Sequence, residues 1–113
     1  MKRLAFLGAA VLVVAAIALP ITIAGGVTSD SVTAKEYKFT LSSKSVRHGT
    51  VTFRVTNRGK LAHDFKIAGK KTKILQKGKS TTLTVRLRKG SYRYVCTIPG
   101  HADKGMKGTL RVT

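Results

Sequence analysis

The chain has 113 residues and is strongly basic, with 22 Lys and Arg against four Asp and Glu and a formal net charge of +18 at pH 7. This length holds one domain and a short appendage, which excludes a large multidomain enzyme. The single Cys excludes an internal disulfide. Basic charge is also typical of nucleic-acid-binding proteins, but the sequence contains no recognition helix and no aromatic pair of the RNA-binding type. We therefore expect no nucleic-acid partner.

Residues 1–24 are predicted to be an export leader. Lys2 and Arg3 precede an almost unbroken apolar run over residues 4–23, and small residues follow. The run is also long enough to span a bilayer, so an uncleaved N-terminal membrane anchor is the alternative to a signal peptide. Pro20 and the small residues favour cleavage. Either way the domain is expected to be exported, to the periplasm or the extracellular face of the cell membrane, soluble or held by the N-terminal segment.

The rest of the chain has a β pattern. Residues 25–32 are polar and are predicted to be a tether or a frayed first strand, and residues 33–113 are predicted to be one domain. Apolar and polar side chains alternate over residues 36–41, 51–56 and 83–88, which gives each run one buried and one exposed face. Gly-containing turns separate such runs. The pattern predicts an all-β fold, a Greek-key antiparallel β-sandwich of about seven or eight strands.

The most specific chemical signal is a cluster of sulfur and imidazole donors near the C-terminus. Cys96, His101 and Met106 lie within eleven residues, and the chain has no other Cys and no other Met except Met1. Each residue alone would be an ordinary core or loop residue. Two His and one Cys with a weak axial Met hold copper for electron transfer, whereas structural zinc sites use Cys and His in close pairs. The cluster therefore favours copper.

The second imidazole is predicted to come from His63. It shares strand parity with Phe65, and Cys96 shares it with Tyr94, so both donors should point inward at one end of the sandwich. Copper bound there should add to stability, so the metal-free form is expected to melt lower. The remaining histidine, His48, has the parity of outward-facing residues and is predicted to be a surface turn residue.

These residues carry a family resemblance. The segment Y-R-Y-V-C-T-I-P-G-H-A-D-K-G-M-K-G-T-L-R-V, from Tyr92 to Val112, resembles the ligand loop of the type 1 blue copper proteins of the plastocyanin and azurin group, the cupredoxins. Upstream, the segment from Gly49 to Phe65 resembles the same family's strand, Asn-x-Gly turn and first His ligand. The resemblance implies one type 1 copper ion with three equatorial ligands, His63, Cys96 and His101, and one axial ligand, Met106.

The resemblance also implies a function, that of an electron carrier and not an enzyme, shuttling single electrons between redox partners outside the cytoplasm through Cu(II)/Cu(I). It implies that His101 exposes an edge within a small apolar patch and serves as the electron port, with Pro99, Ala102, Leu61 and Ala62 around it. The alternative is a copper chaperone or scavenger outside the cytoplasm. Such proteins usually use several exposed Met or Cys ligands, whereas this chain offers one of each.

One residue departs from the family pattern. Many members carry an Asn after the first His ligand, where its side chain ties the two ligand loops together, but this chain has Asp64. A carboxylate there is expected to stabilise Cu(II) and lower the reduction potential, unless it is protonated or paired with a Lys or Arg.

The charge predicts the kind of partner. Without Lys2 and Arg3 of the leader, 20 basic residues remain against four acidic ones, which gives about +16. A surface that is only solvated normally mixes both signs. We therefore expect transient encounters with acidic redox partner proteins, or attraction to an anionic membrane or cell-wall surface, both weakened by salt. The chain itself is expected to be a monomer.

Overall fold

The structure, a computed structural model, describes residues 27–113. The predicted leader, residues 1–24, lies outside this range, and residues 27–32 of the predicted tether form the first part of a strand. In the described range, no helix has the length and apolar character needed to cross a membrane. The nine strands are β1 (Val27–Lys35), β2 (Lys38–Leu41), β3 (Ser45–Val46), β4 (Gly49–Asn57), β5 (Lys66–Ile67), β6 (Lys70–Lys71), β7 (Ser80–Leu87), β8 (Gly90–Val95) and β9 (Lys107–Val112).

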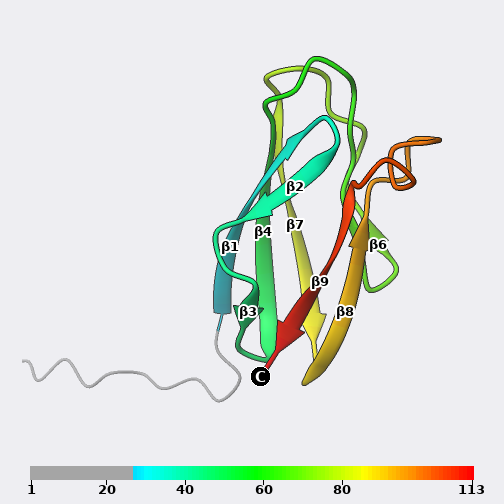
Figure 1. The fold of residues 1–113 in the computed structure, drawn as a ribbon. Coiled ribbons are helices and arrows are strands. Elements are labelled where there is room, and N and C mark those ends of the chain that lie inside the picture. Colours follow the sequence, from blue (N-terminus) through cyan, green and yellow to red (C-terminus); the bar gives the residue numbers. More distant parts are fainter. Residues whose placement is uncertain (1–26) are drawn as a thin grey trace, which may run out of the picture.

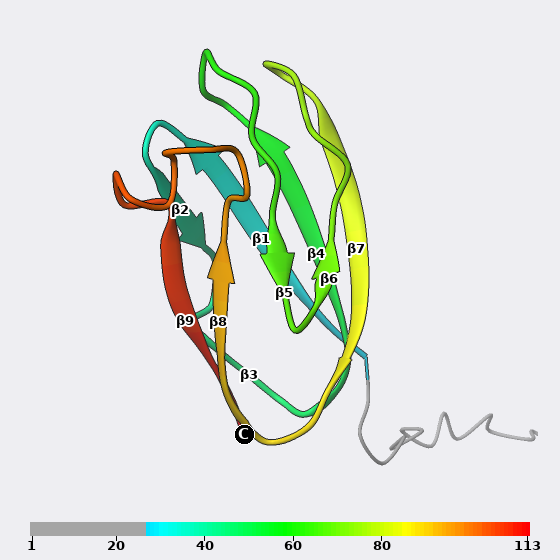
Figure 2. The same cartoon turned by 90° about the vertical axis from the view of Figure 1, so that its right-hand side faces the viewer.

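The strands form two sheets that pack face to face (Figures 1 and 2). One sheet has the order β2-β1-β4-β7 and the other the order β3-β9-β8-β5-β6. The predicted all-β sandwich is confirmed. Two details differ from the prediction of an antiparallel sandwich of seven or eight strands. The described residues form nine strands, and β1 runs parallel to β4 and β3 parallel to β9. Side-chain alternation reports which face of a strand is buried and is the same for both strand directions, so it did not reveal the parallel pairs.

The core between the sheets is organised around Phe65. Its ring centre lies 5.3 Å from those of Phe39 in β2 and Phe53 in β4, and 5.5 Å from that of Tyr94 in β8. Aromatic pairs of this kind add about 0.5–1.5 kcal/mol beyond the burial of their area. Because Phe65 follows His63 by two residues, the packing that joins the sheets also fixes the segment that carries the first predicted ligand.

One end of the sandwich, the upper end in Figure 1, gathers four chain segments. They are the turn between β1 and β2, the segment after β4, the segment before β7, and the loop between β8 and β9, drawn in orange. His63 and Leu75 form a single antiparallel bridge between two of these segments, with N–H···O distances of 3.1 and 2.8 Å. The predicted ligands lie at this end.

Candidate metal centre

Three of the four predicted ligands converge on one buried point. The Nδ1 atoms of His63 and His101 are 3.1 Å apart, and the Sγ atom of Cys96 lies 3.7 Å from His101 Nδ1. One ligand atom from each residue lies within 4.8 Å of the other two. The exposed fractions are 0% for His63, 2% for Cys96 and 8% for His101.

Met106, the fourth predicted ligand, is buried beside Cys96. It is fully buried and belongs to a small apolar cluster with Cys96 and Ala34. The Cys96 N–H donates to the Met106 carbonyl at 3.0 Å, and the Met106 N–H donates to the His101 carbonyl at 3.1 Å. The loop after β8 therefore folds back on itself and brings its three predicted ligands to neighbouring points.

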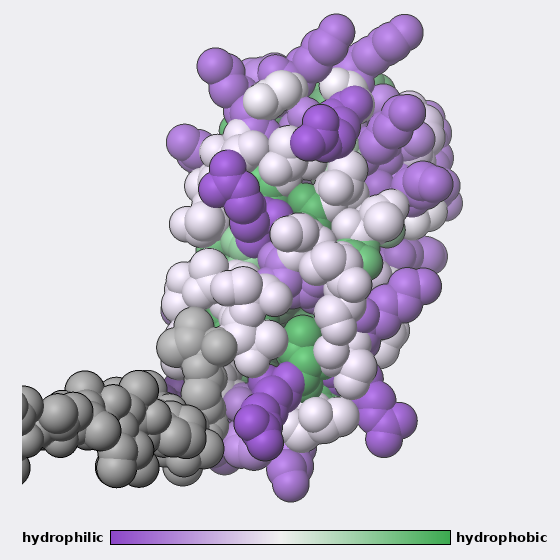
Figure 3. Space-filling view, turned by 90° about the vertical axis from the view of Figure 1, so that its left-hand side faces the viewer, coloured by the Kyte–Doolittle hydropathy of each residue, from purple (hydrophilic) through white to green (hydrophobic). Residues whose placement is uncertain are grey.

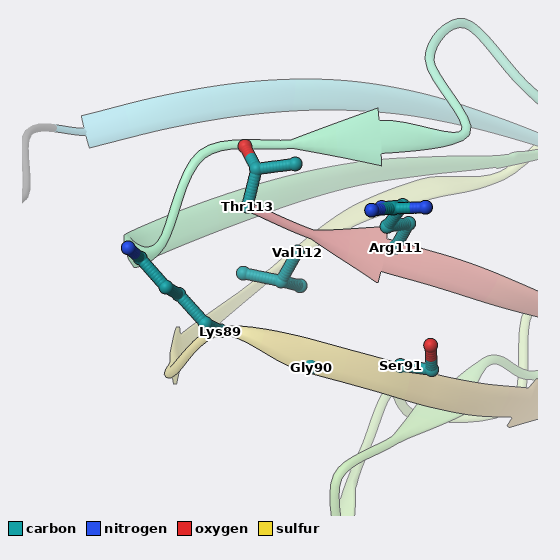
Figure 4. Close-up of a pocket in the computed structure, with 6 residues that line it drawn as sticks. All are labelled: Lys89, Gly90, Ser91, Arg111, Val112 and Thr113. Atoms are coloured by element: carbon teal, nitrogen blue, oxygen red, sulfur yellow. The ribbon is translucent and has the colours of Figure 1, made fainter.

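The third histidine lies elsewhere. His48 precedes β4, at the end of that strand away from the cluster, and its Nδ1 lies 2.9 Å from the carbonyl oxygen of Thr113. A pocket of about 510 Å³ also lies at this far end (Figure 4). It is lined by Lys89, Gly90, Ser91, Arg111, Val112 and Thr113, which include no Cys, His or carboxylate side chain.

The segment that carries His63 is held by Asn57, the last residue of β4. The Asn57 side chain is fully buried, and its Nδ2 donates to the carbonyls of Leu61 and Leu75 at 2.8 Å each. Its Oδ1 accepts the N–H of Gly59 at 2.9 Å. The Asn-x-Gly turn seen in the sequence is thus a hydrogen-bonded clamp on the first ligand segment.

Asp64 joins the two ligand-bearing segments. It is 1% exposed, its Oδ1 accepts the Thr97 N–H at 2.6 Å, and its Oδ2 accepts the Thr97 hydroxyl. Since Asp64 follows His63 and Thr97 follows Cys96, these bonds connect the neighbours of two predicted ligands. The carboxylate makes the connection that the resemblance attributed to an Asn.

The turn between β1 and β2 supplies two residues that the sequence did not indicate. The Glu36 carboxylate lies 2.9 Å from Nε2 of His63, and the Tyr37 ring packs edge-on against His101 with ring centres 5.3 Å apart. The Nζ atom of Lys104 lies 4.7 Å from the centre of the Tyr37 ring. The only available signal was that Glu36 is one of four acidic residues in a basic chain.

The surroundings set the protonation of the donors. Burial raises the pKa of the Cys96 thiol and lowers the pKa of His101, so the metal-free site favours a neutral thiol and a neutral imidazole. The pKa of Glu36 is lowered to about 2, mainly because the backbone N–H groups of Leu61 and Lys60 donate to its carboxylate. A metal ion that binds to Cys96 must displace the thiol proton.

The donor set fits one copper ion. Nitrogen and sulfur atoms that share an ion at bond lengths of about 2.0–2.3 Å lie roughly 3–4 Å apart, and the separations of 3.1 and 3.7 Å in the structure fall in this range. Because Glu36 engages Nε2 of His63, the Nδ1 atom is the one left for a metal. Two imidazoles with one thiolate and a nearby thioether form the type 1 copper set.

Comparison with known proteins places the chain in a family. Residues 5–112 match the model of the cupredoxin-like domain. The chain belongs to the cupredoxin-like domain family. A stretch of 43 residues of this cupredoxin is 51% identical to auracyanin-B of Chloroflexus aurantiacus. That stretch is 37% of this chain and spans 18% of the length of auracyanin-B.

Solved structures agree with the fold of this cupredoxin. Auracyanin A, a blue copper protein from Chloroflexus aurantiacus, is 21% identical over 78% of this chain and 100% of its own, with a TM-score of 0.66. Rusticyanin from Thiobacillus ferrooxidans is 26% identical over 79% of each chain, with a TM-score of 0.67. These findings support the blue copper family that the sequence resembled, whose cofactor is one type 1 copper ion. Membership of the plastocyanin and azurin group within it stays a prediction.

Proposed function

We propose that this cupredoxin is a one-electron carrier of the plastocyanin and azurin type, and not an enzyme, with copper held by His63, Cys96, His101 and Met106. The observation that supports the proposal is the convergence of two imidazole Nδ1 atoms and one cysteine sulfur on a buried point. Bound copper supplies the one-electron couple between Cu(II) and Cu(I).

The surrounding residues hold the metal donors in place and keep water away from them. The Asn57 clamp and the bonds between Asp64 and Thr97 hold the donors from two sides, and burial keeps water away from them. A site that moves little between oxidation states exchanges electrons quickly, because little reorganisation accompanies the transfer.

His101 is the proposed electron port. At 8% exposed it is the least buried of the three converging donors, and Leu61, at 44% exposed, is one of the large apolar side chains that remain at the surface. Pro99 is also exposed, and Ala62 and Ala102 are half-buried. We propose that these residues form an apolar patch around the barely exposed imidazole, which would suit brief contact with a partner because it requires no tight binding.

The partner and the location belong to the same proposal. An acidic redox protein outside the cytoplasm is the partner that best matches a chain with 22 basic and four acidic residues and an N-terminus with the pattern of an export leader. An anionic membrane or cell-wall surface would be attracted by the same charge.

The test is addition of Cu(II) to the purified full chain with visible and electron spin resonance spectra. We expect an intense blue charge-transfer band and narrow copper hyperfine splitting, both lost in Cys96→Ser and both kept in His48→Gln, a matched change of the remaining histidine. A colourless wild type that binds zinc as well as copper would refute the proposal.

The same sample tests the alternative of a copper chaperone or scavenger. The burial of His63, Cys96 and Met106 favours a retained ion, because handing a metal to another protein needs accessible ligands. Rapid passage of Cu(I) to an acceptor protein, without a reversible redox wave in voltammetry, would support the alternative instead.

A further inference from the structure

We propose that Glu36 is a positioning residue for the metal centre: its carboxylate fixes the ring of His63 and biases the site toward the oxidised metal. The part of this proposal that concerns oxidation state rests on the proposed function. The part that concerns the ring does not, because it applies equally to the metal-free chain.

Hydrogen bonds hold both oxygens of the Glu36 carboxylate next to the His63 ring. One carboxylate oxygen of Glu36, Oε1, lies 2.9 Å from His63 Nε2 and accepts the Leu61 N–H at 2.7 Å. The other, Oε2, accepts the Lys60 N–H at 3.1 Å. The Glu36 side chain is 21% exposed and the His63 side chain 0%. Two backbone donors thus hold the carboxylate in place before it meets the ring.

Gly59 makes room for this arrangement. A Cβ atom built at Gly59 would lie 2.3 Å from Oε1 and 2.7 Å from Oε2 of Glu36, closer than non-bonded atoms approach. The carboxylate therefore occupies the space that any other side chain at position 59 would need. Replacing this glycine displaces the carboxylate without removing its charge.

The chemistry follows from the acceptor-only character of a carboxylate. His63 must carry its proton on Nε2 to donate to Glu36, which leaves the Nδ1 lone pair facing His101 Nδ1, 3.1 Å away. A carboxylate on the far nitrogen of a ligating histidine fixes the ring and raises the basicity of the ligand. A more basic ligand with a nearby negative charge stabilises Cu(II) over Cu(I), and this lowers the reduction potential.

The first test uses the metal-free full chain and nitrogen-15 NMR of the histidine rings. In the wild type we expect His63 to be protonated on Nε2, with a proton that exchanges slowly. In Glu36→Ala and in Gly59→Ala we expect a mixture of ring tautomers and fast exchange. A wild-type His63 protonated on Nδ1, or a ring unchanged in both variants, would overturn the positioning role.

The second test is the reduction potential of the copper-loaded chain. In Glu36→Gln we expect the preference for Cu(II) over Cu(I) to fall about tenfold, which is 59 mV for one electron. Gly59→Ala should raise the potential in the same direction with no change of net charge. The control is Asp103→Asn, which removes the same charge from an exposed residue of the ligand loop and should change the preference less than about twofold because solvent screens it.

The outcomes separate this proposal from the proposed function. Equal shifts in Glu36→Gln and Asp103→Asn, or no shift in Gly59→Ala, would overturn the bias toward the oxidised metal. Failure of the wild type to bind copper would refute the proposed function, and the NMR test of the metal-free chain would still decide the role of Glu36.

Discussion

Asp64 places a negative charge between two predicted ligands. Its carboxylate accepts two bonds from Thr97, so both oxygens are used in joining the ligand segments. An Asn at this position could keep both contacts, because its oxygen would accept the Thr97 N–H and its amide could donate to the Thr97 hydroxyl oxygen. The connection between the two ligand segments and the negative charge of Asp64 can therefore be tested separately.

We predict that Asp64→Asn raises the reduction potential of the copper-loaded chain and leaves its fold intact. Removing one charge near the ion weakens the preference for Cu(II) by an interaction on the order of 1–2 kcal/mol at the effective dielectric of a protein, which corresponds to roughly 40–90 mV for one electron. Voltammetry of both proteins measures the shift, and the blue band reports whether the site is preserved.

Thr97→Val provides the matched control. It removes the hydroxyl donor to Asp64 but keeps the backbone N–H bond and the charge. Its potential should move less than that of Asp64→Asn. An equal or larger shift in Thr97→Val would mean that the hydroxyl bond, and not the charge, sets the effect of Asp64.

The candidate ligands could be picked out at the residue scale, and the structure brings three of them together, whereas the residues that support them could not be predicted. His63, Cys96, His101 and Met106 are rare residue types with specific chemistry, so their order and spacing in the sequence were informative by themselves. For Glu36, the alternating run of residues 36–41 predicts only an outward-facing side chain. Its contact with His63 spans 27 residues and depends on where the turn after β1 lies, which local patterns do not encode.

At the scale of elements, β4 links the core to the metal centre. Its middle residue Phe53 packs against Phe65 inside the sandwich, and its last residue, Asn57, clamps the segment of His63. A single strand thus connects the packed core to the segment that carries one predicted ligand. Breaking the clamp should loosen the ligand segment while leaving the sheets paired.

We predict that Asn57→Ala lowers the free energy of unfolding of the metal-free chain by about 2–4 kcal/mol. Three hydrogen bonds are lost, and with them the buried Gly59 N–H loses its acceptor and the Leu61 carbonyl its Asn57 donor, whereas the Leu75 carbonyl keeps the His63 N–H. Urea unfolding measures the loss. Thr56→Ala, which removes only an exposed bond to Ser80, should change stability by less than about 0.5 kcal/mol. Similar losses in the two variants would contradict the clamp.

The strands themselves show what alternation can and cannot predict. Alternation over residues 51–56 was enough to predict a strand there, and in the structure buried positions alternate with partly or fully exposed ones along the nine residues of β4. β5 and β6 have two residues each, too few for a period to appear. The polar beginning of β1 resembled a tether, but it pairs in parallel with β4 and buries Asp30. Pairing partners, and not composition, make that segment a strand.

At the scale of the whole molecule, copper should act as a part of the core. We predict that its removal lowers the melting temperature by on the order of 15 °C or more. Free copper a thousandfold above its dissociation constant adds about 4 kcal/mol. Each kcal/mol is worth roughly 4–8 °C for a domain of this size. Calorimetry with and without a chelator measures the difference, and equal melting temperatures would refute the stabilising role.

Three of the four acidic residues are buried or held in hydrogen bonds. Asp30 and Asp64 are 2% and 1% exposed, and the Glu36 carboxylate is occupied by backbone N–H groups and His63. Asp103 is the one acidic residue in the exposed class. In Figure 3, purple, hydrophilic side chains project mainly around the edges of the face, with white and green side chains between them. Because 22 basic residues stand against four acidic ones, the net field outside the molecule is strongly positive.

This field should govern the rate at which the reduced site meets a charged oxidant. We predict that oxidation by the anion hexacyanoferrate(III) slows several-fold as ionic strength rises from 10 to 150 mM, since the screening length falls from about 30 to about 8 Å. Oxidation by a cationic cobalt complex should accelerate over the same range, because the repulsion is screened. Stopped-flow loss of the reduced state measures both rates. Parallel salt dependences for the two oxidants would show that the charge does not steer encounters at the port, and would remove the main reason to seek an acidic partner.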